Sequence, residues 1–209
     1  MKKVFLWSLI LAGCSFMYAG CSKEPLANLT AEESRIYITD HDSSINFSNY
    51  KTYGVADSVL VIDNGQATVQ LDNSDAAYIE GVKKYMNAAG YILVSKSKNP
   101  DLGVNVNHII RTTTGVISYG DYWDDYGSYW DPYYWGYSGY GYYVPYAYSV
   151  YQINEGAISV NLLDLKNASD NTIDVTWTGL IRAPGIFNAA VADSQVKALF
   201  DQSPYLKTN

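Results

Sequence analysis

The side chains best suited to bind a ligand are concentrated between residues 119 and 151. This tract holds 13 of the 21 tyrosines and three of the five tryptophans, with no lysine or arginine. Tyr and Trp combine a wide apolar face with a polar edge, so they suit wet surfaces that stack on sugar rings or contact peptides. We therefore predict a ligand-binding platform made by Trp123, Trp130, Trp135, Tyr126 and Tyr133. The alternative is a Tyr- and Gly-rich loop that only joins two strands.

Four aspartates in the same tract are the candidates for metal binding or acid catalysis. They are Asp121, Asp124, Asp125 and Asp131. Carboxylates are ligands that hard cations prefer, but this spacing does not match a calcium-binding loop with its distal glutamate. A glycosidase pair needs a defined separation and one raised pKa, and the sequence indicates neither. We predict that these aspartates keep an aromatic loop solvated and hold no metal.

The two histidines do not suggest catalysis either. His108 alternates in phase with Val104 and Val106, which predicts a hydrogen-bonded histidine facing the core or a sheet end. His41 stands between two aspartates in a turn. There is no recognisable serine–histidine–acid order and no phosphate-binding glycine loop. We expect no catalytic residue, metal or cofactor, and we predict that the protein is not an enzyme.

The first 21 residues have the order of a bacterial lipoprotein signal. A charged start precedes a short apolar run, and small residues then lead to Cys14 and Cys21. The run is far below the ~20 apolar residues that a spanning helix needs. A cysteine after the cleavage point would carry lipid chains such as palmitate. Cys14 fits the usual motif better, but Cys21 leaves a polar tether, so we predict Cys21 as the anchor and keep Cys14 as the alternative.

Composition limits the class of protein. Without Lys2 and Lys3 the net charge falls from −7 to −9. This balance argues against nucleic acid and against electrostatic docking on anionic lipid. Cleavage at Cys21 leaves one cysteine, the lipid site, so no disulfide is expected. We predict a protein held by its lipid anchor at the outer membrane, on the periplasmic face or the cell surface.

The chain divides into a signal peptide at 1–20, a tether at 21–34 and one α+β domain at 35–205, with the aromatic insert at 119–151. Alternating or β-branched runs predict strands at residues 35–39, 50–55, 58–62, 91–94, 102–111, 157–165 and 173–178. Helical spacing predicts a helix at 75–89, capped by Asn73 or Ser74 and stopped by Gly90, and another that Asn188 opens. This order predicts a single antiparallel or mixed sheet with two helices packed on one face.

The alternation near the C-terminus predicts which side chains form the core. Ile173, Val175 and Trp177 are expected to face inward together, with Thr176 and Thr178 on the opposite, outer face. The apolar pattern lies wholly outside residues 121–148. That span is therefore expected to contribute nothing to the core, and its replacement by a short linker should leave the domain folded.

Five segments carry a resemblance to a known family. They are residues 39–42 running into 45–53, Gly90 and Tyr91 after a helix, residues 99–106, residues 155–164, and residues 177–179. In order and spacing they resemble the lipoprotein family called domain of unknown function 4136, over most of residues 37–205. Asn161 stands where that family usually has an acid. The resemblance implies an anchored Gram-negative envelope protein with an α+β domain and no established catalytic residues.

Two hypotheses for the function follow. The first is a membrane-anchored, non-catalytic binding module that takes glycan or peptide ligands through the aromatic loop. The second is a structural protein of the outer-membrane envelope that has no small ligand. In the second case it would bind a neighbouring envelope protein through the sheet edge or the aromatic insert.

Overall fold

The computed structural model describes residues 30, 33–63, 66–111, 117–118, 132–146, 149–150 and 156–208. The chain divides into two units, Met1–Glu33 and Ser34–Asn209. The fold described below is that of the second unit. The predicted lipid anchor, Cys21, lies outside the described residues. No helix in the described ranges is both long and apolar enough to cross a bilayer.

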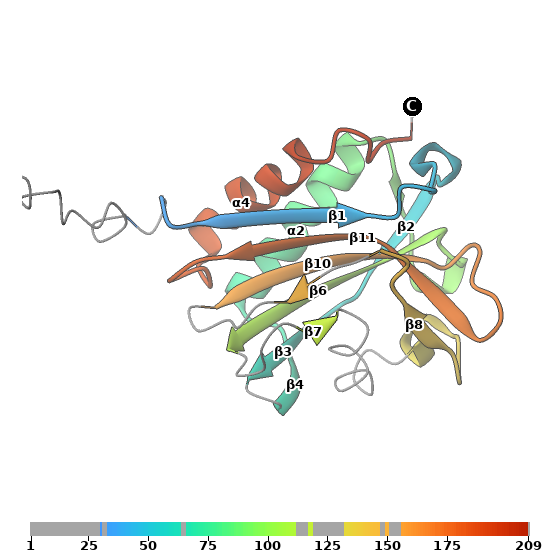
Figure 1. The fold of residues 1–209 in the computed structure, drawn as a ribbon, viewed down its shortest axis with the longest axis horizontal. Coiled ribbons are helices and arrows are strands. Elements are labelled where there is room, and N and C mark those ends of the chain that lie inside the picture. The colour runs from blue at the N-terminus through green and yellow to red at the C-terminus, as the bar shows by residue number, and fades with distance from the viewer. Residues whose placement is uncertain are drawn as a thin grey trace, which may run out of the picture. The chain divides into compact units, whose positions relative to one another are not determined.

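A nine-stranded mixed sheet forms the centre of the described unit (Figure 1). Its main path runs in the order β1-β11-β10-β6-β2-β5. These strands are β1 Ile36–His41, β11 Thr172–Arg182, β10 Ala157–Asp164, β6 Leu102–Arg111, β2 Thr52–Val55 and β5 Ile92–Leu93. Strands β1, β11, β10 and β6 pair antiparallel with their neighbours in that order. Strand β2 pairs parallel with both β5 and β6. The predicted α+β class with a mixed sheet is confirmed.

Three further strands join this sheet off its main path. β3 (Val59–Asp63) pairs with β6 and with β4 (Gln66–Gln70), and β8 (Gly141–Tyr143) pairs parallel with β11. A separate small sheet pairs β7 (Ile117–Ser118) with β9 (Ser149–Val150). Residues at the two ends of the aromatic insert therefore pair as an antiparallel ladder. Short 3-10 helices complete the unit: η2 Phe47–Asn49, η3 Lys96–Lys98 and η4 Pro132–Trp135.

Helices α2 (Asn73–Ala88) and α4 (Ala189–Asp201) lie together on one face of the sheet (Figure 1). Asp72 caps α2, and its carboxylate and that of Asp75 satisfy each other's backbone N–H groups in a capping box. The predicted cap at Asn73 or Ser74 is wrong by one or two residues, because two acids three apart satisfy two free N–H groups at once. Gly90 adopts a φ of +95° after the helix, which confirms it as the stop.

The sheet is buried on both faces. One core cluster lies between the sheet and the helices and includes Tyr53, Tyr78, Val82, Met86, Leu162, Trp177, Val196 and Leu199. A second cluster lies on the opposite face and includes Leu60, Ile62, Ile109, Trp135, Ala157, Leu163, Ile173 and Val175. Side chains of residues 134–146 pack against this second cluster. The expectation that residues 121–148 lie outside the core is therefore wrong.

A β-bulge in β11 reverses the predicted pattern of alternation. Leu162 of β10 faces Trp177, but the next residue, Leu163, faces Val175. Thr176 is thus the extra residue of the bulge. The side chain of Trp177 consequently points toward the helices, while that of Val175 points to the second core cluster.

Because of this bulge, two predictions about β11 are wrong. Ile173 and Val175 do not share a face with Trp177. Thr176 and Thr178 are buried, with exposed fractions of 0% and 1%, although both were expected to point outward. The Thr176 hydroxyl donates to the carbonyl of Leu162 at 3.1 Å. Period-two alternation held on each side of the bulge and failed across it, since one inserted residue moves every later side chain to the other face.

The strand predicted at residues 91–94 is short, and its side chains are only partly buried. β5 has two residues and ends the main strand path. Ile92 and Leu93 are exposed by 62% and 42%, whereas Tyr91 is buried. An apolar run alone does not distinguish a central strand from an edge strand.

Buried tyrosines should make the fold sensitive to alkali. Burial raises the pKa of Tyr53 to about 12 and also raises the pKa values of Tyr78 and Tyr91. The neutral phenols stabilise the fold fully below the unfolded pKa of about 10, and this contribution is lost as the pH rises through the folded pKa. We expect the free energy of unfolding to fall above about pH 10. Denaturant titrations at stepped pH, with phenolate absorbance, measure this, and an unchanged profile in Tyr53→Phe would contradict a role for Tyr53.

Candidate functional site

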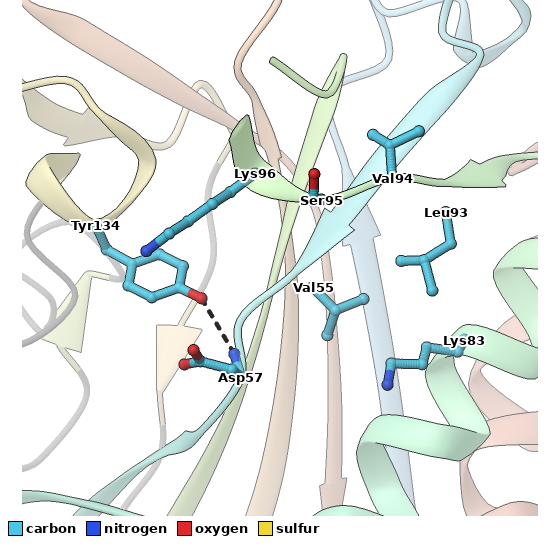
Figure 2. Close-up of a pocket in the computed structure, with 8 residues that line it drawn as sticks. All are labelled: Val55, Asp57, Lys83, Leu93, Val94, Ser95, Lys96 and Tyr134. Atoms are coloured by element: carbon cyan, nitrogen blue, oxygen red, sulfur yellow. Dashed lines mark hydrogen bonds between the residues drawn. The ribbon is translucent and has the colours of Figure 1, made fainter. Parts of the chain in front are cut away.

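A groove of about 490 Å³ opens where the sheet edge meets the described part of the aromatic insert (Figure 2). Its lining is Val55, Asp57, Lys83, Leu93, Val94, Ser95, Lys96 and Tyr134. A second hollow of about 250 Å³ shares Val55, Asp57 and Lys83 and extends toward Leu71, Ile79 and Glu80. Strands β2 and β5, helix α2 and the 3-10 helices η3 and η4 thus all contribute to the groove.

One wall of the groove is held by contacts between Tyr134 and the sheet. The backbone N–H of Asp57 donates to the Tyr134 hydroxyl at 3.2 Å, and the Lys96 ammonium lies 3.9 Å from the centre of the Tyr134 ring. Figure 2 shows Lys96 reaching across the groove toward this ring. Burial raises the pKa of Tyr134, so its hydroxyl stays neutral at physiological pH. The wall therefore offers an aromatic face beside a cation.

Trp135 supports this wall by packing against both Tyr134 and the sheet. Its ring packs edge-on against that of Tyr134, at 5.0 Å between centroids and 86° between planes. It also covers two glycines of the sheet: a Cβ on Gly103 would lie 3.0 Å from Trp135 Cε2, and a Cβ on Gly54 would lie 3.1 Å from Cζ3. The missing side chains at these glycines let the indole approach the sheet backbone.

The opposite side of the groove has charged and apolar groups and an open strand edge. Lys83 pairs with Glu80 at 2.7 Å on α2. The N–H groups of Ile92 and Val94 donate to the carbonyls of Lys51 and Tyr53, each at 2.9 Å. The backbone N–H and C=O groups of successive residues point alternately to the two sides of a strand. Leu93 lies between Ile92 and Val94, so its backbone groups point away from β2. Because β5 ends the main strand path, the backbone of Leu93 points to the open edge.

The predicted platform residues have different positions. Tyr133 is 71% exposed on η4, in keeping with a surface aromatic. Trp135 is only 8% exposed and belongs to the second core cluster, so its ring has no free face for stacking. The other three, Trp123, Trp130 and Tyr126, lie outside the described residues. The tract thus supplies both core and surface, a division that its uniform composition does not reveal.

Sequence reasoning missed the residues that line the groove. Tyr134 is one of 13 tyrosines in its tract, and Lys83 and Lys96 come from separate elements. Pro132 at the start of η4 was the one local signal, because proline favours the first turn of a helix.

His108 forms a separate buried polar contact on the helix side of the sheet. Its Nδ1 lies 3.2 Å from Asp75 Oδ1, and Gln70 Nε2 donates to Asp75 Oδ2 at 2.9 Å. Burial lowers the pKa of His108, and the neighbouring Asp75 opposes this. Asp75 also completes the cap of α2, so the contact joins a helix end to two strands. The prediction of a hydrogen-bonded, core-facing histidine is confirmed.

The described residues contain no group of three or more His, Cys, Asp or Glu side chains placed to hold a metal ion. The four candidate aspartates, Asp121, Asp124, Asp125 and Asp131, lie outside the described ranges.

These features define an α+β protein whose sheet is covered by two helices on one face and packs against aromatic residues on the other. A family model described as "Domain of unknown function (DUF4136)" matches residues 38–205. The chain belongs to this family.

The fold also resembles that of a solved member of the family. A crystal structure of a DUF4136 family protein from Bacteroides thetaiotaomicron is 26% identical with a TM-score of 0.69, covering 84% of this chain and 98% of that one. A PDZ domain protein from Parabacteroides distasonis is 13% identical with a TM-score of 0.45, covering 83% of this chain and 37% of that one. No curated protein sequence matches.

Proposed function

We propose that this protein is a lipid-anchored, non-catalytic envelope module that binds an extended peptide segment of a partner protein in the groove. The observation that carries the proposal is the meeting of an open strand edge at Leu93 with the aromatic wall of Tyr134. Peptides that add to a sheet edge gain affinity from main-chain hydrogen bonds and specificity from side-chain pockets. The groove offers both.

The lining favours a segment of mixed character. Val55, Leu93 and Val94 supply apolar surface, while Lys83 and Lys96 supply cations and Asp57 an anion. Ile92 and Leu93 extend the apolar surface along the exposed edge strand. We infer an extended ligand with alternating apolar side chains and at least one acidic group near Lys96. A glycan stacked on the aromatic residues is the competing ligand.

Leu93→Asp should weaken peptide binding, because it places a charge in the apolar part of the groove. Ile36→Asp is the matched control, since Ile36 is 45% exposed on β1 at the other end of the strand path. A photo-crosslinking amino acid at each position, in detergent-solubilised envelopes, would identify the partner segment by mass spectrometry. We expect crosslinks at position 93 alone. Affinity of the synthetic segment should fall at least tenfold in Leu93→Asp, a loss of about 1.4 kcal/mol.

Two results would contradict the peptide proposal. Equal crosslinking at positions 36 and 93 would show that the groove is not the contact site. Competition of the crosslink by envelope glycans, with no peptide adduct, would favour the glycan ligand.

The anchor is tested separately. Because a charged start, an apolar run and a small-residue–cysteine end mark lipoprotein signals, Cys21→Ala should leave the protein as an unprocessed precursor or in the soluble periplasmic fraction. Cys14→Ala should change neither mass nor fractionation. Intact mass of the mature protein decides between them, and a mass that fits acylated Cys14 would overturn the choice of Cys21.

A further inference from the structure

The second hollow, beside the groove, is small and mostly apolar. Its volume is about 250 Å³, and its apolar lining residues are Val55, Ala56, Leu71, Ala76 and Ile79. Its charged lining residues are Asp57, Glu80 and Lys83. Sites for whole small molecules usually span about 300–1,000 Å³, so this hollow has the size for a single side chain.

Helix α2 forms one wall of the second hollow. Ala76, Ile79, Glu80 and Lys83 all line it, and their spacing of three, four and seven residues places them on one face of the helix. Alanine adds a single carbon to this row. A leucine at position 76 would extend into the hollow without weakening the helix, because leucine is a good helix former. Ala76 is therefore the residue that leaves the space open.

Leu71 forms the rim of the hollow and is held in place although it is 56% exposed. Both residues that flank it bond to Asp75 Oδ2. Gln70 Nε2 donates to this oxygen at 2.9 Å, and the backbone N–H of Asp72 donates to it at 3.0 Å. A large apolar side chain fixed at the surface beside a hollow is a feature of interaction sites, and a wall that is already ordered costs little further ordering on binding.

The charges of the lining indicate which side chain fits. Glu80 and Lys83 pair with each other at 2.7 Å, which leaves Asp57 as the remaining charge in the lining. An acidic side chain would meet this carboxylate, and an apolar one would cover Leu71 and Ile79. The groove and the second hollow share Val55, Asp57 and Lys83, so one extended segment can occupy both (Figure 2).

We propose that the second hollow receives one large apolar side chain of the partner segment, such as leucine, methionine or phenylalanine, and that Ala76 sets the size it accepts. The inference rests on the proposed peptide groove and names the feature by which the groove would recognise its partner. The segment would carry an apolar anchor residue for the second hollow and a separate acidic residue for Lys96.

A library of random short peptides displayed on phage, selected on the full chain, tests this inference. We expect the selected peptides to share one large apolar position, the anchor. A synthetic peptide of the selected sequence should lose at least tenfold in affinity when alanine replaces the anchor, measured by fluorescence anisotropy. Ala76→Leu should cause a similar loss with the parent peptide and none with the alanine peptide, because a filled hollow no longer distinguishes the two.

Ala88→Leu is the matched control, since it makes the same substitution at an exposed position of α2 that lines neither hollow. It should bind the parent peptide as the wild type does. Leu71→Ala removes the rim and should also weaken the parent peptide, which keeps the test decisive if Ala76→Leu does not fold.

The anchor inference is overturned if Ala76→Leu binds the parent peptide as tightly as the wild type, or if it weakens the parent and alanine peptides equally. Lysine or arginine at the shared position, or a library that yields no binder, would also overturn it. Leu93→Asp separates this failure from that of the groove. Weaker binding in Leu93→Asp with no effect of Ala76→Leu contradicts the anchor alone, whereas unchanged binding in Leu93→Asp contradicts the groove itself.

Discussion

Replacing Trp177 with alanine should lower the free energy of unfolding by about 3–5 kcal/mol, because it leaves a large cavity in the core beneath the helices. The indole has no exposed surface and belongs to the first core cluster. It lies over Gly179, where an added Cβ would come within 2.5 Å of Cη2, and its Nε1 donates to Ser203 Oγ at 2.9 Å. One residue thus links β11 to the segment after α4.

Two further substitutions test whether the cavity causes the loss of unfolding free energy in Trp177→Ala. Trp177→Phe keeps most of the ring and loses the hydrogen bond, so its cost should be much smaller. Leu71→Ala removes an apolar side chain that is 56% exposed and should stay within about 0.5 kcal/mol. Urea denaturation followed by circular dichroism measures all three. Equal midpoints for Trp177→Ala and Leu71→Ala would show that the indole is not in the core.

Replacing residues 132–146 by a Gly–Ser linker should destabilise the domain at least as much as Trp135→Ala alone, about 3–5 kcal/mol. This segment carries Trp135 onto Gly54 and Gly103 and supplies β8, which pairs with β11. Its removal uncovers Leu165, Ile173 and Val175 of the second core cluster. We expect a lower urea midpoint and new binding of a hydrophobic dye.

Tyr133→Ala is the control for this segment, because Tyr133 shares η4 with Trp135 but is 71% exposed. It should leave the midpoint unchanged within about 0.5 kcal/mol. A linker variant that unfolds at the wild-type midpoint would show that the segment is a removable loop, as its composition suggested. In that case the wall of the groove would also be dispensable for folding.

Local patterns in the sequence predicted most elements of the fold. Helical spacing of apolar residues located α2 and α4, and Gly90 and Asn188 marked helix ends because each satisfies a backbone requirement within a few residues. Alternation located β1, β6 and the part of β11 before the bulge. His108 was assigned to the core from its phase alone, because β6 has no bulge between it and Val104.

Only the tertiary structure decided which sheet face the residues after the β11 bulge occupy and which side chains of the aromatic tract are buried. The bulge at Thr176 arises from pairing between β10 and β11, so no pattern within β11 predicts that Trp177 and Val175 face opposite ways. Trp135 and Tyr133 come from the same aromatic tract, yet only the first meets Gly54 and Gly103 across the sheet. Contacts between residues distant in sequence have no local signature, and the groove is built from such contacts.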